Sequence, residues 1–378
     1  MDDDELSIRH ILNNKMNSNF MNLFLSVFLV MLTACGGSAK TEDGTVVFTR
    51  DDFAETRELV NPEEITIDSL LNPASFHVLR DSVLVVSNQD NCEYMLELYS
   101  LNTHEPLARL ARKGNGPEDM LSCSAIINSA SSSKFGLQDW NATTYYTVDL
   151  DTLLQTERLS PLSKFRYSSE ILQTVGLCPL DEEHYIGYNM WYLDDEAYTN
   201  VPEPLTIYEI NQDSGKDMGD FSSFVASVNG ASMFRNPQSG ELWTLDLHRD
   251  LIQIYNDSLQ VIRTIQGPDA FAPKYIRVES PAPINFISFA DDYEYRTYSD
   301  YFLTDKHLYL VYVGDEHFNP EEMGPVEIFK LDYEGNLLCR YLLDRYVYSI
   351  SVDASDKYLY AASRESVKEL PVLLKYTL

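Results

Sequence analysis

The sequence predicts an all-β fold, a six-bladed β-propeller with four strands per blade. Helical periodicity is almost absent after about residue 60, and short runs rich in β-branched and aromatic residues alternate with turn residues. Runs that share one pattern start at residues 82, 133, 183, 240, 306 and 357, so the steps between them are 51, 50, 57, 66 and 51 residues. Short strands that recur at such a period are typical of a propeller.

A second series of strands follows in phase with the first, and most of its members continue through a tight turn into a further strand. Five of its six runs carry an aromatic residue at the same position, namely Tyr99, Tyr208, Tyr255, Phe329 and Tyr376. Alternation of this kind is expected of strands packed between neighbouring sheets. A pair of β-sandwiches is the competing architecture, but it does not predict six copies in phase.

The two ends of the repeat predict how the ring closes. The last unit stops one strand short at Leu378, and the segment Glu64–Asp68 is left over before the first complete unit. We expect this segment to become the outer strand of the last blade beside residues 372–378, which would remove an open sheet edge.

The N-terminal region has the layout of a secretory signal. An apolar run from Phe20 to Leu32, too short to span a bilayer, ends in small residues and Cys35. A buried core helix or a membrane anchor is the alternative reading. Residues 2–5 are acidic, which is unusual for a signal peptide, so translation is expected to start at Met16 or Met21 and residues 1–15 to be a mis-called start.

The segment around Cys35 resembles the lipobox of bacterial lipoproteins. That resemblance implies a lipid on Cys35 and attachment to a membrane through it. The next residue is Gly36 rather than the aspartate that resembles an inner-membrane retention mark, which favours the outer membrane, on its periplasmic or cell-surface side. The predicted organisation is a signal peptide over 1–35, a tether over 36–60 and the propeller over 61–378.

Charge and cysteine content narrow the class of partner. Without residues 1–34 the chain has 26 basic and 55 acidic residues, a net charge of −29, which disfavours nucleic acid. We expect a monomer. Four cysteines follow Cys35, none with metal-ligand spacing, and their pairing stays open. The pair Cys92–Cys123 would be the first to check.

Two further segments carry a family resemblance. The loop at Arg112–Asp119 and the segment Leu343–Asp353 resemble those of the TolB-like six-bladed propeller lipoproteins of Bacteroidetes. The resemblance covers residues 61–378. The resemblance implies a propeller in the cell envelope and carries over no catalytic residue. Many relatives have a loop richer in glycine, whereas Asp119 and Met120 follow Glu118 here.

Long connections predict which face of the propeller is functional. Nearly all of them join the second strand to the third, or one blade to the next, so they share one face. Neutral variation in loop length is the alternative. Aromatic rings beside carboxylates and amides suit sugars or cationic peptides. The candidate ligand residues on this face are Asp139, Trp140, Asn189, Trp191, Asp246, His248 and Asp315.

No catalytic motif is found in the sequence, so no catalytic residue, metal or cofactor is predicted. His248 and His317 lie near acidic residues and could join a metal or acid–base site, whereas the acidic stretches 213–217 and 353–356 match turns better than a calcium loop. The predicted function is a binding or scaffold module for a glycan, peptide or envelope protein. The alternative is an envelope enzyme, such as a glycan lyase, hydrolase or lactonase, with its site in the central channel. The innermost strands are mostly apolar or hydroxylic, which favours binding.

Overall fold

The computed structural model describes residues 39–41, 44–67, 73–88, 92–127, 129–166, 177–179, 184–188, 205–209, 215–217, 232–271, 275–278, 286–289, 294–319, 321–364 and 369–378. The chain divides into two units, residues 1–39 and 40–378, and the sheets belong to the second. The described residues are almost entirely strands and turns, which confirms the predicted all-β propeller. Within them, no helix has the length and apolarity that crossing a bilayer requires.

Three sheets of four strands each come first along the chain. Within each sheet, consecutive strands pair antiparallel. The strands are β5 (Pro73–Leu79), β6 (Val83–Asn88), β7 (Tyr94–Ser100) and β8 (Pro106–Arg112); β9 (Ser124–Ile126), β10 (Lys134–Asp139), β11 (Thr144–Asp149) and β12 (Ser163–Arg166); and β13 (Cys178–Pro179), β14 (His184–Tyr188), β15 (Leu205–Glu209) and β16 (Gly215–Asp217).

Three further sheets follow, with a two-stranded pair inserted before the second of them. The strands are β17 (Ser232–Arg235), β18 (Leu242–Leu245), β19 (Leu251–Tyr255) and β20 (Val261–Gln266); the inserted pair β21 (Tyr275–Val278) and β22 (Phe286–Phe289); β23 (Glu294–Leu303), β24 (His307–Phe318), β25 (Glu327–Asp332) and β26 (Leu337–Leu343); and β27 (Val347–Val352), β28 (Tyr358–Ser363) and β29 (Val372–Thr377).

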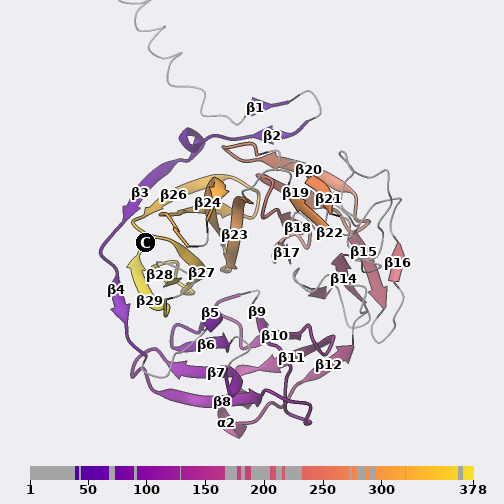
Figure 1. Ribbon diagram of the computed structural model, residues 1–378, viewed down its shortest axis with the longest axis vertical. Coiled ribbons are helices and arrows are strands. Elements are labelled where there is room, and N and C mark those ends of the chain that lie inside the picture. The colour runs from indigo at the N-terminus through magenta and orange to yellow at the C-terminus, as the bar shows by residue number, and fades with distance from the viewer. Residues whose placement is uncertain are drawn as a thin grey trace, which may run out of the picture. The chain divides into compact units, whose positions relative to one another are not determined.

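The first strands β5, β9, β17, β23 and β27 lie toward a common centre (Figure 1). Side chains of one sheet accept hydrogen bonds from backbone N–H groups of the first strand in the next sheet. Ser351 Oγ accepts from Val78 N at 2.7 Å, and Ser87 Oγ accepts from Ala125 N at 3.0 Å. The inner edge of a first strand would otherwise leave these donors unpaired, so the contacts fix neighbouring sheets to one another.

The N-terminal part of the second unit runs along the outer strands of three sheets. β2 (Val46–Val47) pairs parallel with β20, β3 (Glu55–Leu59) pairs parallel with β26, and β4 (Glu63–Ile65) pairs antiparallel with β29. We call residues 46–65 the rim segment; in Figure 1 it is the indigo strand at the edge of the last three sheets. The sequence analysis places Ile65 beside residues 372–378, and Ile65 does lie opposite Leu373. Residues 46–59, assigned there to a tether, are part of these sheets.

Apolar and charged anchors hold the rim segment in place. Phe48 and Phe53 are buried and pack on Phe329, with ring centroids 5.9 and 4.8 Å away. Between them the 3-10 turn η1 (Arg50–Asp52) presents Arg50, which bonds to Glu327 through Nε at 2.8 Å. Burial of two aromatic rings contributes several kcal/mol of stabilisation, so the segment is bound as core and not only through its backbone.

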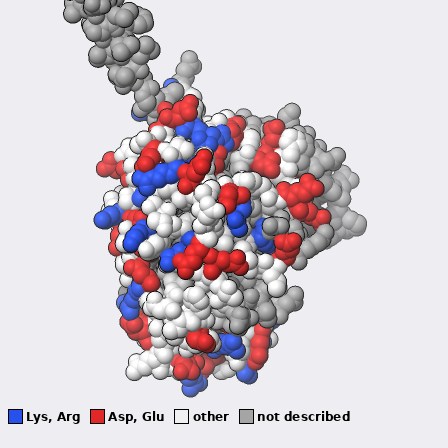
Figure 2. All heavy atoms as spheres, turned by 90° about the vertical axis from the view of Figure 1, so that its left-hand side faces the viewer, with Lys and Arg blue, Asp and Glu red and all other residues white. Residues whose placement is uncertain are grey.

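Acidic and basic side chains are interleaved on the side of the molecule where the rim segment runs (Figure 2). Arg57 of β3 bonds to Glu55 at 2.6 Å, and Lys375 of β29 lies 3.3 Å from Glu63 of β4. Part of the acidic charge along this rim is therefore paired with basic side chains, in a chain whose formal net charge is −31.

One helix occurs where the sequence suggests a turn. Residues following β11 form α2 (Leu150–Thr156), whose first turn is capped by Asp149: its carboxylate accepts from Thr152 N at 3.0 Å. Leu150 and Leu153 are buried against the neighbouring sheet. The capping aspartate and an apolar face explain why the chain continues as two helical turns.

Candidate functional site

The two ends of the sheets differ in their connections. We call the end where second strands join third strands, and one sheet joins the next, the loop side. The opposite end, where first strands join second strands, is the turn side. The sequence analysis places all of its candidate ligand residues on the loop side.

Two of these candidates, Asp139 and Asp246, are buried and hold loops in place. The Asp139 carboxylate accepts from the backbone N–H groups of Leu121, at 2.8 Å, and Ser122, at 3.1 Å. The Asp246 carboxylate bonds to the guanidinium of Arg249. Both carboxylates are less than 2% exposed, so their observed contacts are with the protein itself.

His248 and Asp315 lie on either side of the start of β23. His248 Nδ1 is 2.6 Å from the carbonyl oxygen of Tyr295, and burial lowers the pKa of this imidazole. Asp315 of β24 lies opposite Arg296 of β23 and accepts a hydrogen bond from His317 N at 2.8 Å. The fold thus brings His248, Asp246 and Asp315 to one region, near β23. Trp140 follows β10 in another sheet and is half-buried, while Asn189 and Trp191 lie outside the described residues.

A buried acidic cluster lies beside this region, at the junction of two sheets. Asp250 Oδ2 accepts from the hydroxyl of Tyr312 at 2.8 Å and from the backbone N of Asp269 at 2.7 Å and Ala270 at 3.1 Å. Burial raises the pKa of Asp250, despite these hydrogen bonds. Every donor is part of the protein, so the cluster fixes the start of the long connection after β20.

A cavity of about 590 Å³ opens on the loop side between the last two sheets. Its walls come from the connections after β24, β26 and β28 together with β4. We call it the loop-side cavity, and charged, aromatic and apolar groups all line it: Glu64, Met323, Pro325, Asp344, Arg345, Tyr346, Ser363, Arg364, Glu369, Leu370 and Val372. Such a mixture of groups in one concave site is typical of ligand pockets.

The two arginines of the loop-side cavity are in different electrostatic situations. Arg345 is exposed and bonds to the carboxylate of Asp344 at 3.0 and 3.1 Å. Arg364 is half-buried, its Nε is shielded from solvent, and it has no hydrogen bond or ion pair among the described residues. Its guanidinium carbon lies 4.8 Å from the ring centroid of Tyr348, whose hydroxyl donates to Pro73 O at 3.2 Å.

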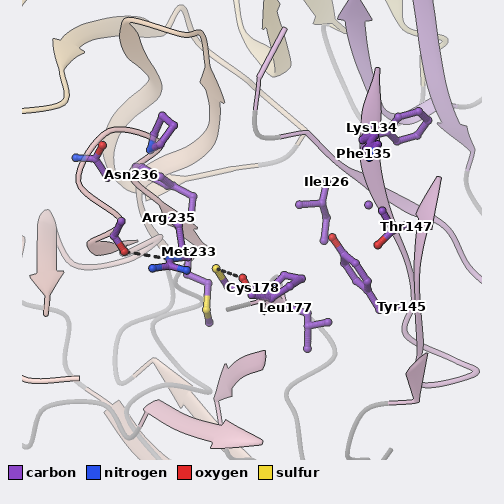
Figure 3. A pocket seen from close by; sticks show the side chains of 15 residues that line it. Ile126, Lys134, Phe135, Tyr145, Thr147, Leu177, Cys178, Met233, Arg235 and Asn236 are labelled. Carbon is purple, nitrogen blue, oxygen red and sulfur yellow. Dashed lines mark hydrogen bonds between the residues drawn. The ribbon is translucent and has the colours of Figure 1, made fainter. Parts of the chain in front are cut away.

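A second cavity, of about 530 Å³, lies on the turn side between three sheets (Figure 3). Met233 and Arg235 line one side of it and Ile126 and Tyr145 the other. Arg235 Nε donates to the carbonyl of Gly240 at 3.0 Å. We call this the turn-side cavity.

The turn-side cavity contains a cysteine but no reactive thiol. Cys178 lines it, and burial raises the pKa of its thiol to about 12, so it stays protonated at neutral pH. All four described cysteines, Cys92, Cys123, Cys178 and Cys339, are free thiols, so no disulfide joins Cys92 to Cys123. Within the described residues no three His, Cys, Asp or Glu side chains gather as a metal site.

Side chains of the first strands pack across the centre of the sheets. The ring of His77 stacks on that of Phe302, with centroids 5.9 Å apart, and both side chains are buried. Burial lowers the pKa of His77 to about 4, so its imidazole is neutral at pH 7. Asp300 accepts from Ile350 N at 2.8 Å, and burial raises the pKa of this carboxyl to about 7. Side chains of described first strands thus pack against one another here.

Fold and cavities together define an all-β propeller with concave sites at both ends of its sheets. The chain belongs to the TolB-like 6-blade propeller-like family, whose model matches residues 57–355. This finding confirms the resemblance noted in the sequence.

Solved structures with a similar fold include two from Bacteroides. A member of the DUF4221 family from Bacteroides vulgatus has 11% identity and a TM-score of 0.54, with 85% of this chain and 97% of that chain covered. A protein from Bacteroides fragilis described as exported has 11% identity and a TM-score of 0.46, with 88% and 99% covered. No curated protein matches the sequence.

The sequence reasoning missed the loop-side cavity and its arginines. Arg345 lies within the ending that carries the family resemblance, and Arg364 directly follows β28. Neither arginine stands out in the sequence as a site residue, because an arginine at a strand end is common on any protein surface. That Arg364 has no carboxylate partner among the described residues appears only in three dimensions.

Proposed function

We propose that this protein is an envelope binding module that holds a glycan, a peptide or a segment of a partner protein on its loop side. The loop-side cavity carries this proposal, because it combines both signs of charge, an aromatic ring and exposed apolar surface in one concave site of about 590 Å³. Leu370, which is 70% exposed at the cavity wall, supports a role in contact with a partner.

The proposed architecture is a closed ring of six blades with four main strands each. The pairing of β4 with β29 supports closure, because it joins the start of the propeller to its last strand. A lipid on Cys35, an outer-membrane location and a monomeric state complete the proposal. The lipobox-like segment before Gly36 supports the first two.

The enzyme alternative places a site in the central channel. The buried contact of His77 with Phe302, and the neutral state of that imidazole, speak for a packed centre over an open catalytic channel. Cys178 is likewise protonated at neutral pH. These observations support binding.

The test uses the full chain in detergent on glycan and peptide arrays, followed by titration of the hits. Leu370→Glu, which places a charge on the exposed wall of the loop-side cavity, should weaken binding about tenfold or more. Ile262→Glu is the matched control, since Ile262 is 52% exposed on β20, away from the cavity. Equal affinity of the two variants, or no binding by the wild-type chain, would overturn the proposal.

A further inference from the structure

The half-buried Arg364 is unusual in a chain that has 59 acidic and 28 basic residues. Most buried or half-buried guanidinium groups in proteins are neutralised by a carboxylate, because removing a charge from water is costly. Other partly buried arginines here follow that rule: Arg50 bonds to Asp269, Arg340 to Glu327 and Arg249 to Asp246. Arg364 has no such partner among the described residues.

The surroundings of Arg364 hold its side chain in one orientation. Its guanidinium lies over the ring of Tyr348 at 4.8 Å, and Tyr348 is itself fixed by its hydrogen bond to Pro73 O at 3.2 Å. The preceding residue, Ser363, is buried and its hydroxyl donates to Tyr346 O at 2.7 Å. A stacked, planar guanidinium loses little entropy when it binds a ligand.

The position of Arg364 also gives a ligand access to it. Arg364 and Tyr346 line the same cavity of about 590 Å³, and the wall nearby carries the exposed Leu370. Arg345 also lines this cavity, but two nitrogens of its guanidinium already donate to the carboxylate of Asp344. Arg364 is therefore the guanidinium whose charge the cavity leaves for a bound molecule.

From these observations we propose that Arg364 binds an oxyanion group of the ligand, a carboxylate, sulfate or phosphate, within the loop-side cavity. This proposal rests on the binding function proposed above. A guanidinium offers paired N–H donors that match two oxygens of such a group, and charge-assisted pairs of this kind are stronger than neutral hydrogen bonds. The ligand would supply the negative charge that no described residue supplies at this position.

The cavity also contains acidic residues that limit which anions fit. Glu64 and Glu369 are exposed lining residues, and neither forms an ion pair with Arg364. Their charge disfavours a ligand with several negative groups and suits one that carries a single oxyanion beside neutral or cationic groups. We therefore expect Glu369→Gln to strengthen binding of a simple anion.

The experiment titrates the full chain with benzoate, benzenesulfonate, phenyl phosphate and neutral benzamide, followed by NMR. At least one anion should bind, benzamide should not, and Arg364→Gln should weaken the anion about tenfold. Arg112→Gln is the matched control, since Arg112 is an exposed arginine of β8 outside the cavity lining, and it should retain binding. Arg364→Lys keeps the charge without the paired donors and should give an intermediate affinity. The relative affinities for the three anions show whether the site prefers a carboxylate, a sulfate-like group or a phosphate.

The outcomes separate this inference from the binding function. If benzamide binds as well as benzoate, or Arg364→Gln binds benzoate as tightly as the wild-type chain, the oxyanion assignment is wrong. If no anion binds while an array ligand binds and Leu370→Glu abolishes that binding, the binding function stands and the oxyanion assignment falls. If neither the anions nor any array ligand binds, both the oxyanion assignment and the binding function are wrong. Thermal melting of each variant shows whether it is folded.

Discussion

The guanidinium of Arg50 donates from both terminal nitrogens to the two carboxylate oxygens of Asp269, at 2.7 Å each. Arg50 belongs to the rim segment, whereas Asp269 follows β20, so this pair joins the N-terminal part of the unit to the connection between two sheets. The hydroxyl of Tyr312 lies 2.8 Å from the same Asp269 carboxylate. A two-point contact of this kind fixes both position and orientation.

Replacing Arg50 should destabilise the protein measurably. Arg50→Gln removes its bonds to Asp269 and Glu327 and leaves two partly buried carboxylates without that cation, at an expected cost of about 1 to 3 kcal/mol. Urea unfolding measures the change. Arg57→Gln is the control, because its pair with Glu55 is exposed to solvent and should contribute much less to stability. Equal losses would show that burial of the Arg50 pair has no role.

Truncating Ile65 tests the contact between β4 and the last sheet. Ile65 is buried opposite Leu373, so Ile65→Ala should cost about 2 to 5 kcal/mol through lost burial and the cavity left behind. Val60→Ala, at a position that is 49% exposed in the same rim segment, should change stability by less than about 0.5 kcal/mol. Chemical unfolding distinguishes the two; a small loss for Ile65→Ala would mean that β4 is dispensable.

A side chain at Gly267 should disrupt the buried acidic cluster. A Cβ at this position would lie 1.8 Å from Oδ1 of Asp250 and 2.4 Å from its Cγ, so Asp250 would have to move away from its donors. We expect Gly267→Ala to cost about 2 kcal/mol or more. Gly324→Ala is the matched control, since no atom lies within 4 Å of its Cβ position. Differential scanning calorimetry of both variants checks this, and equal melting temperatures would contradict the geometry.

The carboxyl of Asp300 predicts a defined pH dependence of stability. Burial raises its pKa from 3.8 to about 7 in the folded state, so the unfolded chain releases this proton more readily. The stabilisation by protonated Asp300 is thus complete below about pH 4 and is lost as the pH rises through about 7. As the pH rises from 4 to 7.5, the free energy of unfolding of Asp300→Asn should therefore increase by roughly 2 to 4 kcal/mol relative to that of the wild-type chain.

Urea unfolding at several pH values across that range measures the Asp300 effect. General repulsion within an acidic chain also grows with pH, so the exposed Asp257→Asn serves as a control that removes the same formal charge from the surface. A pH-independent difference between Asp300→Asn and the wild-type chain would contradict the prediction.

Alkylation should distinguish the partly exposed thiol of Cys92 from the buried thiols of Cys123 and Cys178. Cys92 is half-exposed and should react first with iodoacetamide in the native chain. Cys123 and Cys178 are buried, and burial raises the pKa of each to about 12, so both should react only after unfolding. Peptide mass spectrometry reads the order. A mass loss of two hydrogens on a peptide pair containing Cys92 and Cys123 would show a disulfide instead.

The propeller could be predicted because its core repeats. Tyr99, Tyr255, Phe329 and Tyr376 occupy one position of the second strand series, and all four are buried. Each blade needs a large side chain there to fill the space against its neighbour, so the same residue type recurs at the same spacing. The regular signal in the sequence is thus a direct result of equivalent packing.

The rim segment and the site left no such signal. β3 exposes four of its five residues and β2 has only two, so neither shows the alternation by which a strand is predicted. Asp139 and Asp246 seemed suited to a ligand, yet their carboxylates bond to the protein, because a turn residue and a binding residue look alike in sequence. Arg364 is distinguished only by having no carboxylate partner among the described residues, and that is a property of the folded chain.

The rim segment sets an order in which this polypeptide can fold. Its strands are synthesised before every partner they pair with, and Glu63 pairs with Lys375, three residues from the final Leu378. Contacts so distant in sequence require closure of a very long loop, which slows folding and leaves early strands unpaired for most of synthesis. Of the rim strands, β4 therefore cannot pair before the last strand, β29, has been synthesised, and a chain truncated before β29 would leave β4 unpaired.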